Sequence, residues 1–312
     1  MSPLPVLNHN GGTDLKSVPR LSRLPPWFRV QAHPGPHYRR MKKLVGDLTL
    51  HTVCEEARCP NVWDCWNRGT ATFMILGNVC TRSCGFCAVT TGRPAELDAD
   101  EPRRVAQAVQ ALNLRHAVIT SVNRDERTDG GAEIFAETVQ EIRRLQPDCT
   151  VELLIPDFKG SPAAQDRVFA ARPDILSHNT ETVPRLYRSV RPQGKYFWSL
   201  DLISRAKRTG LVTKSGLMVG LGETADEVQS VMADLVEAGC DVLTLGQYLQ
   251  PTQAHLPVVR YYHPDEFSAL REEGLRRGFR HVESGPLVRS SYHAEQPIPL
   301  VEGADFKPVP RP

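Results

Sequence analysis

The residues best suited to metal chemistry are two groups of three cysteines. One group is Cys80, Cys84 and Cys87, with three residues in the first gap and two in the second. Thiolates this close in sequence can bind one metal centre, and a four-iron cluster normally has four protein ligands. Three cysteines hold three irons and leave the fourth open to a ligand that is not protein. The spacing therefore predicts an iron–sulfur cluster with an open position.

A structural zinc site is the alternative for the Cys80 group. Such a site needs four ligands and usually shows paired cysteines two to four residues apart. After Cys87 the next histidine is His116 and the next cysteine is Cys149. Because no fourth ligand lies nearby in the sequence, the ligand count favours the cluster.

The other group is Cys54, Cys59 and Cys65, separated by four and five residues. These gaps do not suit a zinc ribbon, and three cysteines again fall one short of a closed site. Two alternatives remain: three free buried thiols in a loop with Trp63 and Trp66, or paired zinc sites that use all six cysteines. Two incomplete trios so close together favour a second cluster, whose fourth ligand must come from elsewhere.

The composition is that of a globular protein from a reducing compartment. The chain has 312 residues and a net charge of +2, and six of its eight cysteines fall in the two trios. A disulfide scaffold would be short and dense in cysteine. There is no run of about 18 apolar residues, and the N-terminus lacks the pattern of a secretory signal. We therefore expect a cytoplasmic protein with no membrane segment.

The chain is expected to have four parts. They are an extended arm (1–40), an extension that carries the Cys54 group (41–70), a domain of alternating strands and helices (71–280), and a C-terminal segment (281–312). Basic residues gather where the arm ends, at Arg39, Arg40, Lys42 and Lys43. This basic cluster is either a solvated helix face or a docking surface for an acidic protein.

Six short apolar runs in the third part predict strands, at 71–76, 117–122, 150–155, 175–178, 216–219 and 241–245. Helices are expected between them, for example after Ser161-Pro162 and after a capping box formed by Thr224 and Glu227. Such an alternation forms a parallel sheet with right-handed crossovers. We therefore expect an α/β fold, a partial (β/α)6 barrel similar to a TIM barrel, with N-terminal and C-terminal extensions that carry the second cluster.

The Cys80 group follows the first of these strands, at the end of the barrel where chemistry usually collects. Together with Phe86 before its last cysteine, the group resembles the signature of radical S-adenosylmethionine (SAM) enzymes. In that family the amino and carboxylate groups of SAM occupy the open iron. Gly216, Met218 and Gly220 resemble the strand that contacts adenine in the family, with Met218 in place of isoleucine. Glycines there let the backbone approach a flat ring closely.

One stretch departs from the radical SAM pattern. The Gly-Gly-Glu sequence that often follows the second strand is missing, and the residues from Ser121 to Asp125 stand in its place. Asn123 or Asp125 is therefore expected to bind the amino group of SAM. The alternative is a salt-bridged loop that pairs Arg124 with Asp125 or Glu126.

Three features together resemble the lipoyl synthase family: the spacing of the Cys54 group, the Cys80 group that begins fifteen residues after Cys65, and the terminal Arg-Ser-Ser-Tyr sequence at 289–292. The resemblance runs from Lys42 to Ala294 and leaves the arm and the tail outside it. It implies two 4Fe–4S clusters, the second with a serine hydroxyl as fourth ligand. We choose Ser291 and hold Ser290 in reserve. An alkoxide is a harder ligand than a thiolate and is released by protonation, which leaves one iron labile.

The resemblance also implies a reaction. A radical made from SAM removes hydrogen from C6 and C8 of an octanoyl group on a lysine of a carrier protein, and the second cluster supplies sulfur to both carbons. The implied carriers are an E2 subunit of a dehydrogenase complex or the glycine cleavage H protein. A ferredoxin or flavodoxin would donate electrons, and an iron–sulfur carrier protein would deliver clusters. Asn179, Glu181 and Arg191 are further candidates for contacts with SAM or the lysyl segment.

Two rival functions remain. Another radical SAM enzyme that inserts sulfur would share the Cys80 group, but biotin synthase lacks the Cys54 group and a methylthiotransferase usually carries an added RNA-binding domain. The other rival is a zinc module that binds nucleic acid and has no enzymatic activity. Balanced charge and sparse aromatic residues argue against a nucleic-acid partner. Cys149 and Cys240, outside both groups, are expected to be buried as small apolar residues.

Overall fold

The computed structural model of the chain describes residues 23–30, 35–57, 59–68, 70–297 and 300. Its central sheet has the strand order β1-β2-β5-β6-β7-β8-β9-β10, and a small separate ladder joins β3 and β4. Neighbours from β2 to β10 are parallel, whereas β1 pairs antiparallel with β2 at the edge. The strands are β1 (His51–Thr52), β2 (Thr72–Ile75), β3 (Val79–Cys80), β4 (Thr90–Thr91), β5 (His116–Ser121), β6 (Thr150–Leu154), β7 (Ile175–Ser177), β8 (Val212–Val219), β9 (Val242–Gln247) and β10 (His281–Gly285).

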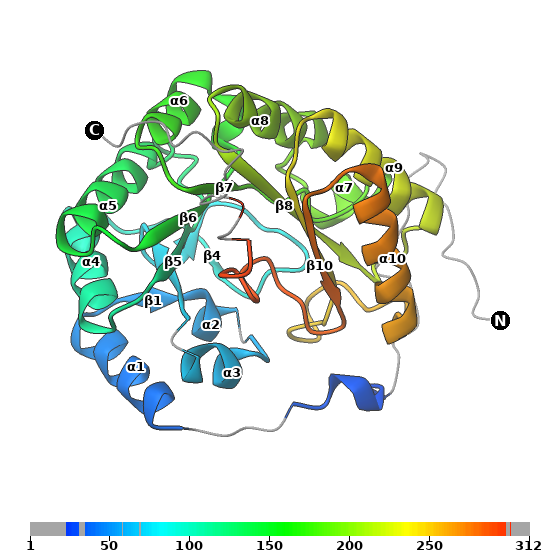
Figure 1. The fold of residues 1–312 in the computed structure, drawn as a ribbon, viewed down its shortest axis with the longest axis horizontal. Helices are drawn as coiled ribbons and strands as arrows, with labels where there is room; N and C mark the ends of the chain where they lie inside the picture. Colours follow the sequence, from blue (N-terminus) through cyan, green and yellow to red (C-terminus); the bar gives the residue numbers. More distant parts are fainter. Residues whose placement is uncertain (1–22, 31–34, 58, 69, 298–299, 301–312) are drawn as a thin grey trace.

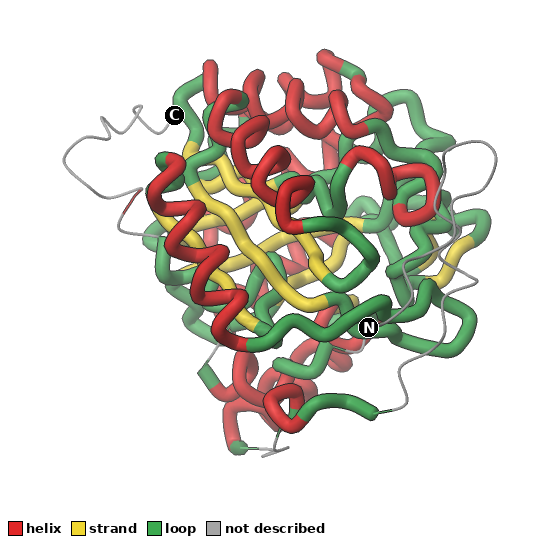
Figure 2. Tube along the Cα trace, turned by 90° about the vertical axis from the view of Figure 1, so that its right-hand side faces the viewer, coloured by secondary structure: helices red, strands yellow, loops and turns green. Residues whose placement is uncertain are grey.

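Helices form an outer ring around these strands, which curl into an incomplete barrel (Figure 1). From the side, the strands are enclosed by helices (Figure 2). The α-helices are α1 (Pro36–Asp47), α2 (Val53–Glu56), α3 (Val62–Asn67), α4 (Glu101–Ala111), α5 (Ala132–Leu145), α6 (Pro162–Ala170), α7 (Tyr187–Val190), α8 (Tyr196–Arg208), α9 (Ala225–Glu237) and α10 (Pro264–Arg277). Short 3₁₀ turns are η2 (Pro26–Phe28), η3 (Phe158–Gly160) and η4 (Pro184–Leu186).

The predicted α/β partial barrel is confirmed, and all six expected strands are present. The caps are confirmed too: the Ser161 hydroxyl accepts from the third residue of α6, and Thr224 and Glu227 form a capping box at α9. The sheet also extends further than six units, because β10 pairs in parallel with β9. Only Val282 of β10 is buried, so this strand has no apolar run that would mark it in the sequence.

Strand β8 begins at Val212, earlier than the apolar run at 216–219 predicted. Its first half contains Lys214, which is 1 % exposed and forms a salt bridge of 2.9 Å with Glu152 of β6. His116 of β5 lies 3.7 Å from the same carboxylate. A buried charge is tolerated only when it is paired in this way. The charged network explains why half of a buried strand looked polar.

The extension before the barrel is built on α1, α2 and α3. Helix α1 packs on α3 through its buried Met41, and the Tyr38 ring lies 4.3 Å from the Trp63 ring and 5.1 Å from the Trp66 ring, centroid to centroid. Because α1 begins at Pro36, the last residues of the predicted arm are helical and not extended. The rest of the arm at 1–22 and 31–34, and the tail at 298–299 and 301–312, lie outside the described residues.

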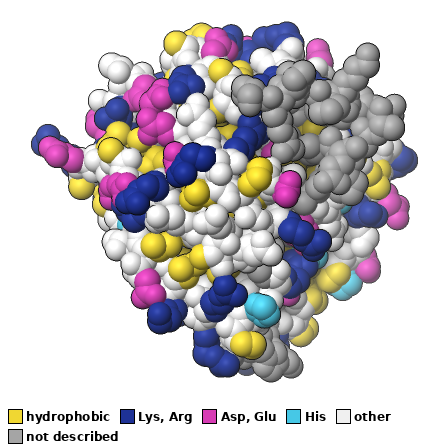
Figure 3. Space-filling model, turned by 60° about the vertical axis from the view of Figure 1, so that its left-hand side comes forward, with side chains coloured by type: hydrophobic (Ala, Val, Ile, Leu, Met, Phe, Trp, Pro, Cys, Tyr) yellow, Lys and Arg dark blue, Asp and Glu magenta, His cyan; other side chains and the backbone are white. Residues whose placement is uncertain are grey.

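The surface carries both signs of charge. Basic and acidic side chains are interspersed on the face drawn in Figure 3, and exposed ion pairs such as Arg144–Glu141 and Arg167–Glu133 join them. The basic cluster of α1 is exposed, and Lys43 pairs with Asp47 within the helix. None of the helices in the described part of the chain is long and apolar enough to cross a membrane.

Candidate active site

The Cys80 group lies in the connection that leaves β2, at the carboxyl end of the parallel sheet. Cys80 ends β3, and its sulfur accepts a hydrogen bond of 3.3 Å from the backbone N–H of Asn123. Gly85 donates from its N–H to the carbonyl of Val190 at 2.9 Å, and its own carbonyl accepts from Leu256 at 3.0 Å. The connections that follow β5, β7 and β9 therefore fix the loop that bears the three cysteines.

Two thiols of this loop, those of Cys84 and Cys87, are held in their neutral form. Burial raises the pKa of Cys84 to about 12 and that of Cys87 to about 11, and the nearby Arg191 opposes the shift at Cys84. Iron binds the thiolate, so loading a cluster here must release protons, and the positive charge of iron drives that release. A thiol-rich loop of this kind suits an iron–sulfur cluster, because soft thiolate ligands select such clusters.

A buried arginine within the same loop organises the carboxylates beside it. Arg82 is 4 % exposed and donates to both oxygens of Asp125 and of Asp157, at 2.6–3.0 Å. Burial alone would raise the pKa of Asp157, but the hydrogen bonds and charge of Arg82 outweigh it, and the pKa is lowered. Asp125 is thus held in place by Arg82, and the contact of Asn123 or Asp125 with the amino group of SAM stays a prediction. The alternative of a salt-bridged loop holds in part, since Arg124 donates to Glu126 at 2.5 Å.

Three further candidates, Asn179, Glu181 and Arg191, meet beside the Cys80 loop. Asn179 donates from its side chain to Glu181 at 3.0 Å, and Arg191 donates to the backbone carbonyl of Asn179 at 2.7 Å. Burial raises the pKa of Glu181 in spite of Arg191. Glu181 also has a positive φ of 66° and is held by backbone hydrogen bonds to Gly216 and Met218. Strained backbone and a perturbed carboxylate often mark a functional site.

The predicted adenine strand has the close packing that its glycines imply. A Cβ atom on Gly216 would lie 2.7 Å from the Asn179 side-chain oxygen, and one on Gly220 would lie 2.0 Å from the Gln247 side chain. Gly220 also has a φ of +101°, which favours glycine. Met218 and Phe86 are both only partly buried against the same hydrophobic cluster. Close packing therefore restricts positions 216 and 220 to glycine, and Met218 and Phe86 keep part of their surface exposed.

Glu223, which follows the glycines, has a structural role. Its carboxylate accepts hydrogen bonds from the N–H groups of Gly220 and Leu221, at 2.6 and 2.9 Å, and from the Tyr262 hydroxyl at 2.8 Å. These bonds close the turn between β8 and α9 and occupy both carboxylate oxygens. The turn therefore holds the backbone of the glycine stretch in place.

Buried polar atoms without partners gather at the same end of the sheet. The described residues offer no hydrogen-bond partner to four of them, on and after β5 and β7: Ser121 Oγ, Asn123 Oδ1, Ser177 Oγ and Asn179 Oδ1. Buried polar groups are normally paired. These atoms therefore fit a polar ligand bound between the Cys80 loop and the ends of the strands.

The Cys54 group forms a second site on the neighbouring extension. Cys54, Cys59 and Cys65 line one small cavity, and Ser291 from the C-terminal segment lines it as well. The remaining lining residues are Asn61, Thr70, Thr72, Arg289 and Tyr292. Ser290, the reserve choice for a ligand, is not among them. Three thiols and the Ser291 hydroxyl, drawn from distant parts of the chain, thus line a single space, together with Thr70, Thr72 and Tyr292.

Hydrogen bonds bring the C-terminal segment to this cavity. Thr72 of β2 donates from its hydroxyl to the Ser291 hydroxyl at 2.7 Å, and the Asn61 side chain donates to the carbonyl of Leu287 at 2.6 Å. A Cβ atom on Gly246 would lie 2.0 Å from the carbonyl oxygen of Val288, so only glycine lets the segment lie against β9. The placement of Ser291 is therefore built into the fold.

Burial also keeps these thiols neutral, because it raises the pKa of Cys54 to about 11 and that of Cys65 to about 12, with a further increase from the neighbouring cysteines. The described residues contain no group of three metal-binding side chains placed around one ion. The four ligands of a four-iron cluster each bind a different iron atom, so they lie farther apart than the ligands of a single metal ion. The absence of a single-ion site in that part of the chain therefore does not count against a cluster. Cys149 and Cys240 lie elsewhere, 1 % and 4 % exposed, which confirms their prediction as buried apolar residues.

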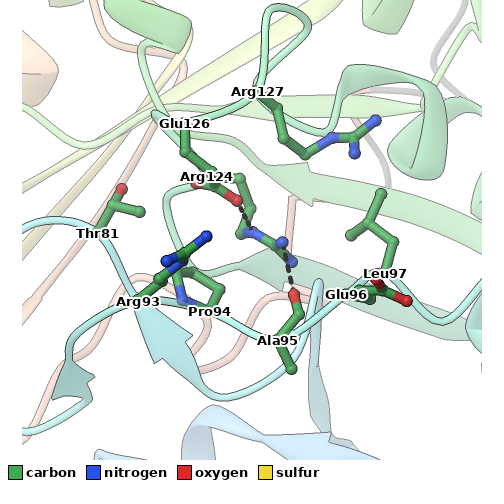
Figure 4. A pocket seen from close by; sticks show the side chains of 9 residues that line it. All are labelled: Thr81, Arg93, Pro94, Ala95, Glu96, Leu97, Arg124, Glu126 and Arg127. Carbon is green, nitrogen blue, oxygen red and sulfur yellow. Dashed lines mark hydrogen bonds and ion pairs between the residues drawn. The ribbon is translucent and has the colours of Figure 1, made fainter.

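A larger, open pocket is lined by Thr81, by the segment from Arg93 to Leu97 and by residues that follow β5 (Figure 4). Arg124 lies across it, bonded to Glu126 and to the carbonyl of Ala95. Arg127, which also lines the pocket, pairs with Asp129. Because its charges are mixed and largely paired, this pocket offers no site built for a charged ligand.

Several residues of both sites cannot be recognised from the sequence alone. Arg82 and Arg289 are arginines inside recognised motifs, and nothing in the motifs distinguishes a buried arginine from an exposed one. Thr72 appears in the sequence as an ordinary strand residue. The only signal was position: Arg82 follows Cys80 closely, and Arg289 precedes the serine pair.

Comparison with known sequences places these sites in a family. The radical SAM superfamily matches residues 74–235, and the N-terminal domain of lipoyl synthase of the radical SAM family matches residues 8–59. The second match includes most of the arm, so the prediction that the resemblance begins only at Lys42 is wrong.

Solved structures share the fold. Methylornithine synthase (PylB) has a TM-score of 0.52 at 14% identity and covers 79% of this chain and 81% of its own. SuiB of Streptococcus suis, solved with S-adenosylmethionine, has a TM-score of 0.55 at 10% identity and covers 78% of this chain and 59% of its own. At these identities the likeness concerns the fold alone.

Curated relatives named lipoyl synthase are much more similar. The protein from Rubrobacter xylanophilus is 61% identical over 87% of this chain and 85% of its own length. The proteins from Koribacter versatilis and Chlorobaculum parvum are 56% and 55% identical, over 87% and 89% of this chain and 90% and 96% of their own. The chain therefore belongs to the lipoyl synthase family of the radical SAM superfamily.

Proposed function

We propose that this chain inserts two sulfur atoms into an octanoyl group on a lysine of a carrier protein, at C6 and C8, to give the lipoyl group. It is a radical SAM sulfurtransferase, and its cofactors are two 4Fe–4S clusters and SAM. The bound SAM supplies the radical that abstracts hydrogen, and the cluster at the Cys54 group supplies the sulfur. Membership of the family, with relatives above 50% identity over most of the chain, supports this assignment.

One observation of the structure carries the proposal furthest. Cys54, Cys59, Cys65 and Ser291 line a single cavity, although Ser291 lies far from the cysteines in sequence. The donor set of three thiols and one hydroxyl suits a cluster in which one iron is held less firmly than the others. Sulfur can be withdrawn only from a cluster that comes apart, so a weak fourth ligand fits a cluster that is consumed.

Each group of residues then has a role. Cys80, Cys84 and Cys87 hold the cluster that binds SAM, and Arg82 keeps their loop and Asp125 in place. The Oδ1 atoms of Asn123 and Asn179, which have no partner among the described residues, accept hydrogen bonds from donor groups of SAM.

Strand β8 contributes adenine contacts through Gly216 and Met218. Gly220, which follows the strand, and Phe86 of the Cys80 loop complete these contacts. Glu181 and Arg191 lie next to Asn179 and complete the polar wall of the SAM site. The division that goes with these roles is an arm (1–40), an auxiliary-cluster extension (41–70), a radical SAM barrel (71–280) and a C-terminal segment with the serine ligand (281–312).

The substrate is an octanoylated carrier protein. We infer that the carrier is an E2 subunit of a dehydrogenase complex or the glycine cleavage H protein, that a ferredoxin or flavodoxin donates electrons, and that an iron–sulfur carrier protein restores the spent cluster. Reduced cysteines throughout the chain fit a cytoplasmic location. The basic cluster of α1 lies on the auxiliary extension, and its exposed charges suit the docking of an acidic carrier.

Counting iron and sulfide after anaerobic reconstitution tests the proposal. The parent should bind about eight irons, and a variant with Cys54→Ala, Cys59→Ala and Cys65→Ala should bind about four. A matched control with Cys149→Ala and Cys240→Ala should keep about eight. Mass spectrometry of an octanoylated carrier domain should show the lipoyl product with the parent and none with the triple variant, which still cleaves SAM. Equal iron contents in parent and triple variant would contradict the assignment.

A further inference from the structure

The auxiliary cavity contains one charged side chain that the function above does not use. Arg289 lines the cavity, and one terminal nitrogen of its guanidinium donates to the carbonyls of Val288 and Gln247, at 2.8 and 3.2 Å. Gln247 ends β9, so the barrel itself fixes the guanidinium position. A guanidinium has five N–H donors. The donors that these two bonds leave over are available to the cavity.

Arg289 is half-buried and differs in its partners from the buried arginines of the chain. Arg82 pairs with Asp125 and Asp157, Arg124 pairs with Glu126, and Arg191 lies 3.6 Å from Asp157. In the described part of the chain, no carboxylate forms an ion pair with Arg289, and the acidic group that acts on it is the Cys59 thiol. A half-buried cation without a carboxylate partner is stabilised by an anion in the cavity that it lines. The cavity therefore suits a negative occupant.

We propose that Arg289 is the cationic partner of the auxiliary cluster and holds it in the cavity by charge and by N–H donors directed at its sulfur. This inference rests on the proposed function, which puts a cluster there. The core of an oxidised four-iron cluster carries fewer positive charges than three thiolates and an alkoxide carry negative ones, so the occupant is an anion. The charge of Arg289 balances it, and neutral lining residues such as Asn61 and Thr70 do not.

Two consequences follow for the properties of the bound cluster. A fixed positive charge favours the more negative, reduced state, and hydrogen bonds to cluster sulfur act in the same direction. Arg289 therefore raises the reduction potential of the auxiliary cluster. It also slows the loss of iron while the serine ligand is off. Lysine would keep the charge but not the planar fork that donates to two acceptors at once.

The test uses the full chain with Cys80→Ala, Cys84→Ala and Cys87→Ala, so that the auxiliary site alone binds a cluster. Arg289→Gln and Arg289→Lys are added separately to this background. Arg144→Gln is the control, because Arg144 lies on α5, is exposed and pairs with Glu141. The measurements are iron and sulfide per chain, the midpoint potential followed by electron paramagnetic resonance, and the rate of iron loss to a chelator.

Arg289→Gln should give a lower midpoint potential and at least about tenfold faster iron loss, as expected for one charge-assisted contact. Arg144→Gln should match the background in both. Arg289→Lys should keep the potential close to that of the background but lose iron several-fold faster, and it decides the matter alone if the Gln variant does not fold. Unchanged potential and iron loss in the Arg289 variants would overturn the inference. A background protein that binds no iron would overturn the auxiliary site itself, and this inference with it.

Discussion

The hydroxyl of Thr72 donates a hydrogen bond of 2.7 Å to the hydroxyl of Ser291. Thr72 lies on β2, the first parallel strand of the barrel, and Ser291 lies in the turn after the last strand. The bond therefore joins the two ends of the barrel at the auxiliary cavity. A donor aimed at the serine oxygen also stabilises that oxygen when it carries negative charge.

Thr72→Val tests this relationship, because valine has nearly the shape of threonine but no hydroxyl. Losing the bond should weaken the hold on Ser291 by about 1 kcal/mol, which is roughly a fivefold change in equilibrium. We expect iron to leave the auxiliary site about five times faster, with the Cys80 cluster unaffected. Chelator kinetics on the reconstituted chain measure this. Thr120→Val, at a β5 hydroxyl that bonds a backbone carbonyl, serves as the control and should leave iron loss unchanged.

Ser291→Ala removes the proposed ligand itself. We expect SAM cleavage to continue and lipoyl formation to fall by at least about tenfold. Without the serine, one iron of the auxiliary cluster has no protein ligand, so the cluster is bound less firmly and does not come apart in the same way. Ser290→Ala is the matched control one residue away, outside the cavity lining, and should retain most of the activity. Product analysis by mass spectrometry separates the two steps. A larger loss with Ser290→Ala than with Ser291→Ala would exchange the two assignments.

The sequence predicts most of the framework, and it does so where a local pattern has a local cause. Six strands are found from apolar runs, and the caps of α6 and α9 from the residue types that bond free N–H groups. Both cysteine groups are found from ligand counting. Strand β10 falls outside the six predicted units because it buries a single side chain, and the first half of β8 is missed because Lys214 breaks its apolar run.

The partners within the sites are a different matter, since they depend on contacts across the fold. Asp125 looks like a ligand in sequence, and its engagement by Arg82 appears only when β5 and the Cys80 loop are placed side by side. Thr72 and Arg289 gain their roles in the same way, from segments that meet at one cavity. The spacing of residues along the sequence does not predict contacts between such distant segments.

Arg82→Met should disrupt both stability and the SAM site. The substitution leaves Asp157 buried without its counter-charge, and removing one partner of a buried pair costs about 3–5 kcal/mol. We expect a clearly lower melting temperature and partial loss of iron from the Cys80 cluster, since Arg82 lies in that loop. Arg144→Met removes an exposed arginine paired with Glu141 and should change neither. Calorimetry and iron analysis check the prediction, and equal melting temperatures for both variants would contradict it.

His178 gives stability a dependence on pH that can be assigned to one residue. Its ring nitrogens contact the Ile155 carbonyl oxygen at 2.8 Å and the Ser199 hydroxyl at 2.9 Å, and burial, with a smaller contribution from Arg191, lowers its pKa to about 4. The unfolded chain has the ordinary pKa near 6.5, so between about 6.5 and 4 it binds a proton that the folded chain does not. Stability is therefore complete above pH 6.5 and falls as the pH decreases.

The expected loss from this residue is roughly 2 kcal/mol between pH 6.5 and 5, at 1.36 kcal/mol per pH unit. His178→Asn keeps hydrogen-bonding atoms but does not titrate in this range. The variant should be less stable at pH 7, and its stability should fall less steeply as the pH is lowered. Denaturant unfolding of parent and variant at pH 7 and 5 measures the difference, and acid damage to clusters cancels because both proteins carry them. Parallel pH curves would show that His178 does not set the dependence.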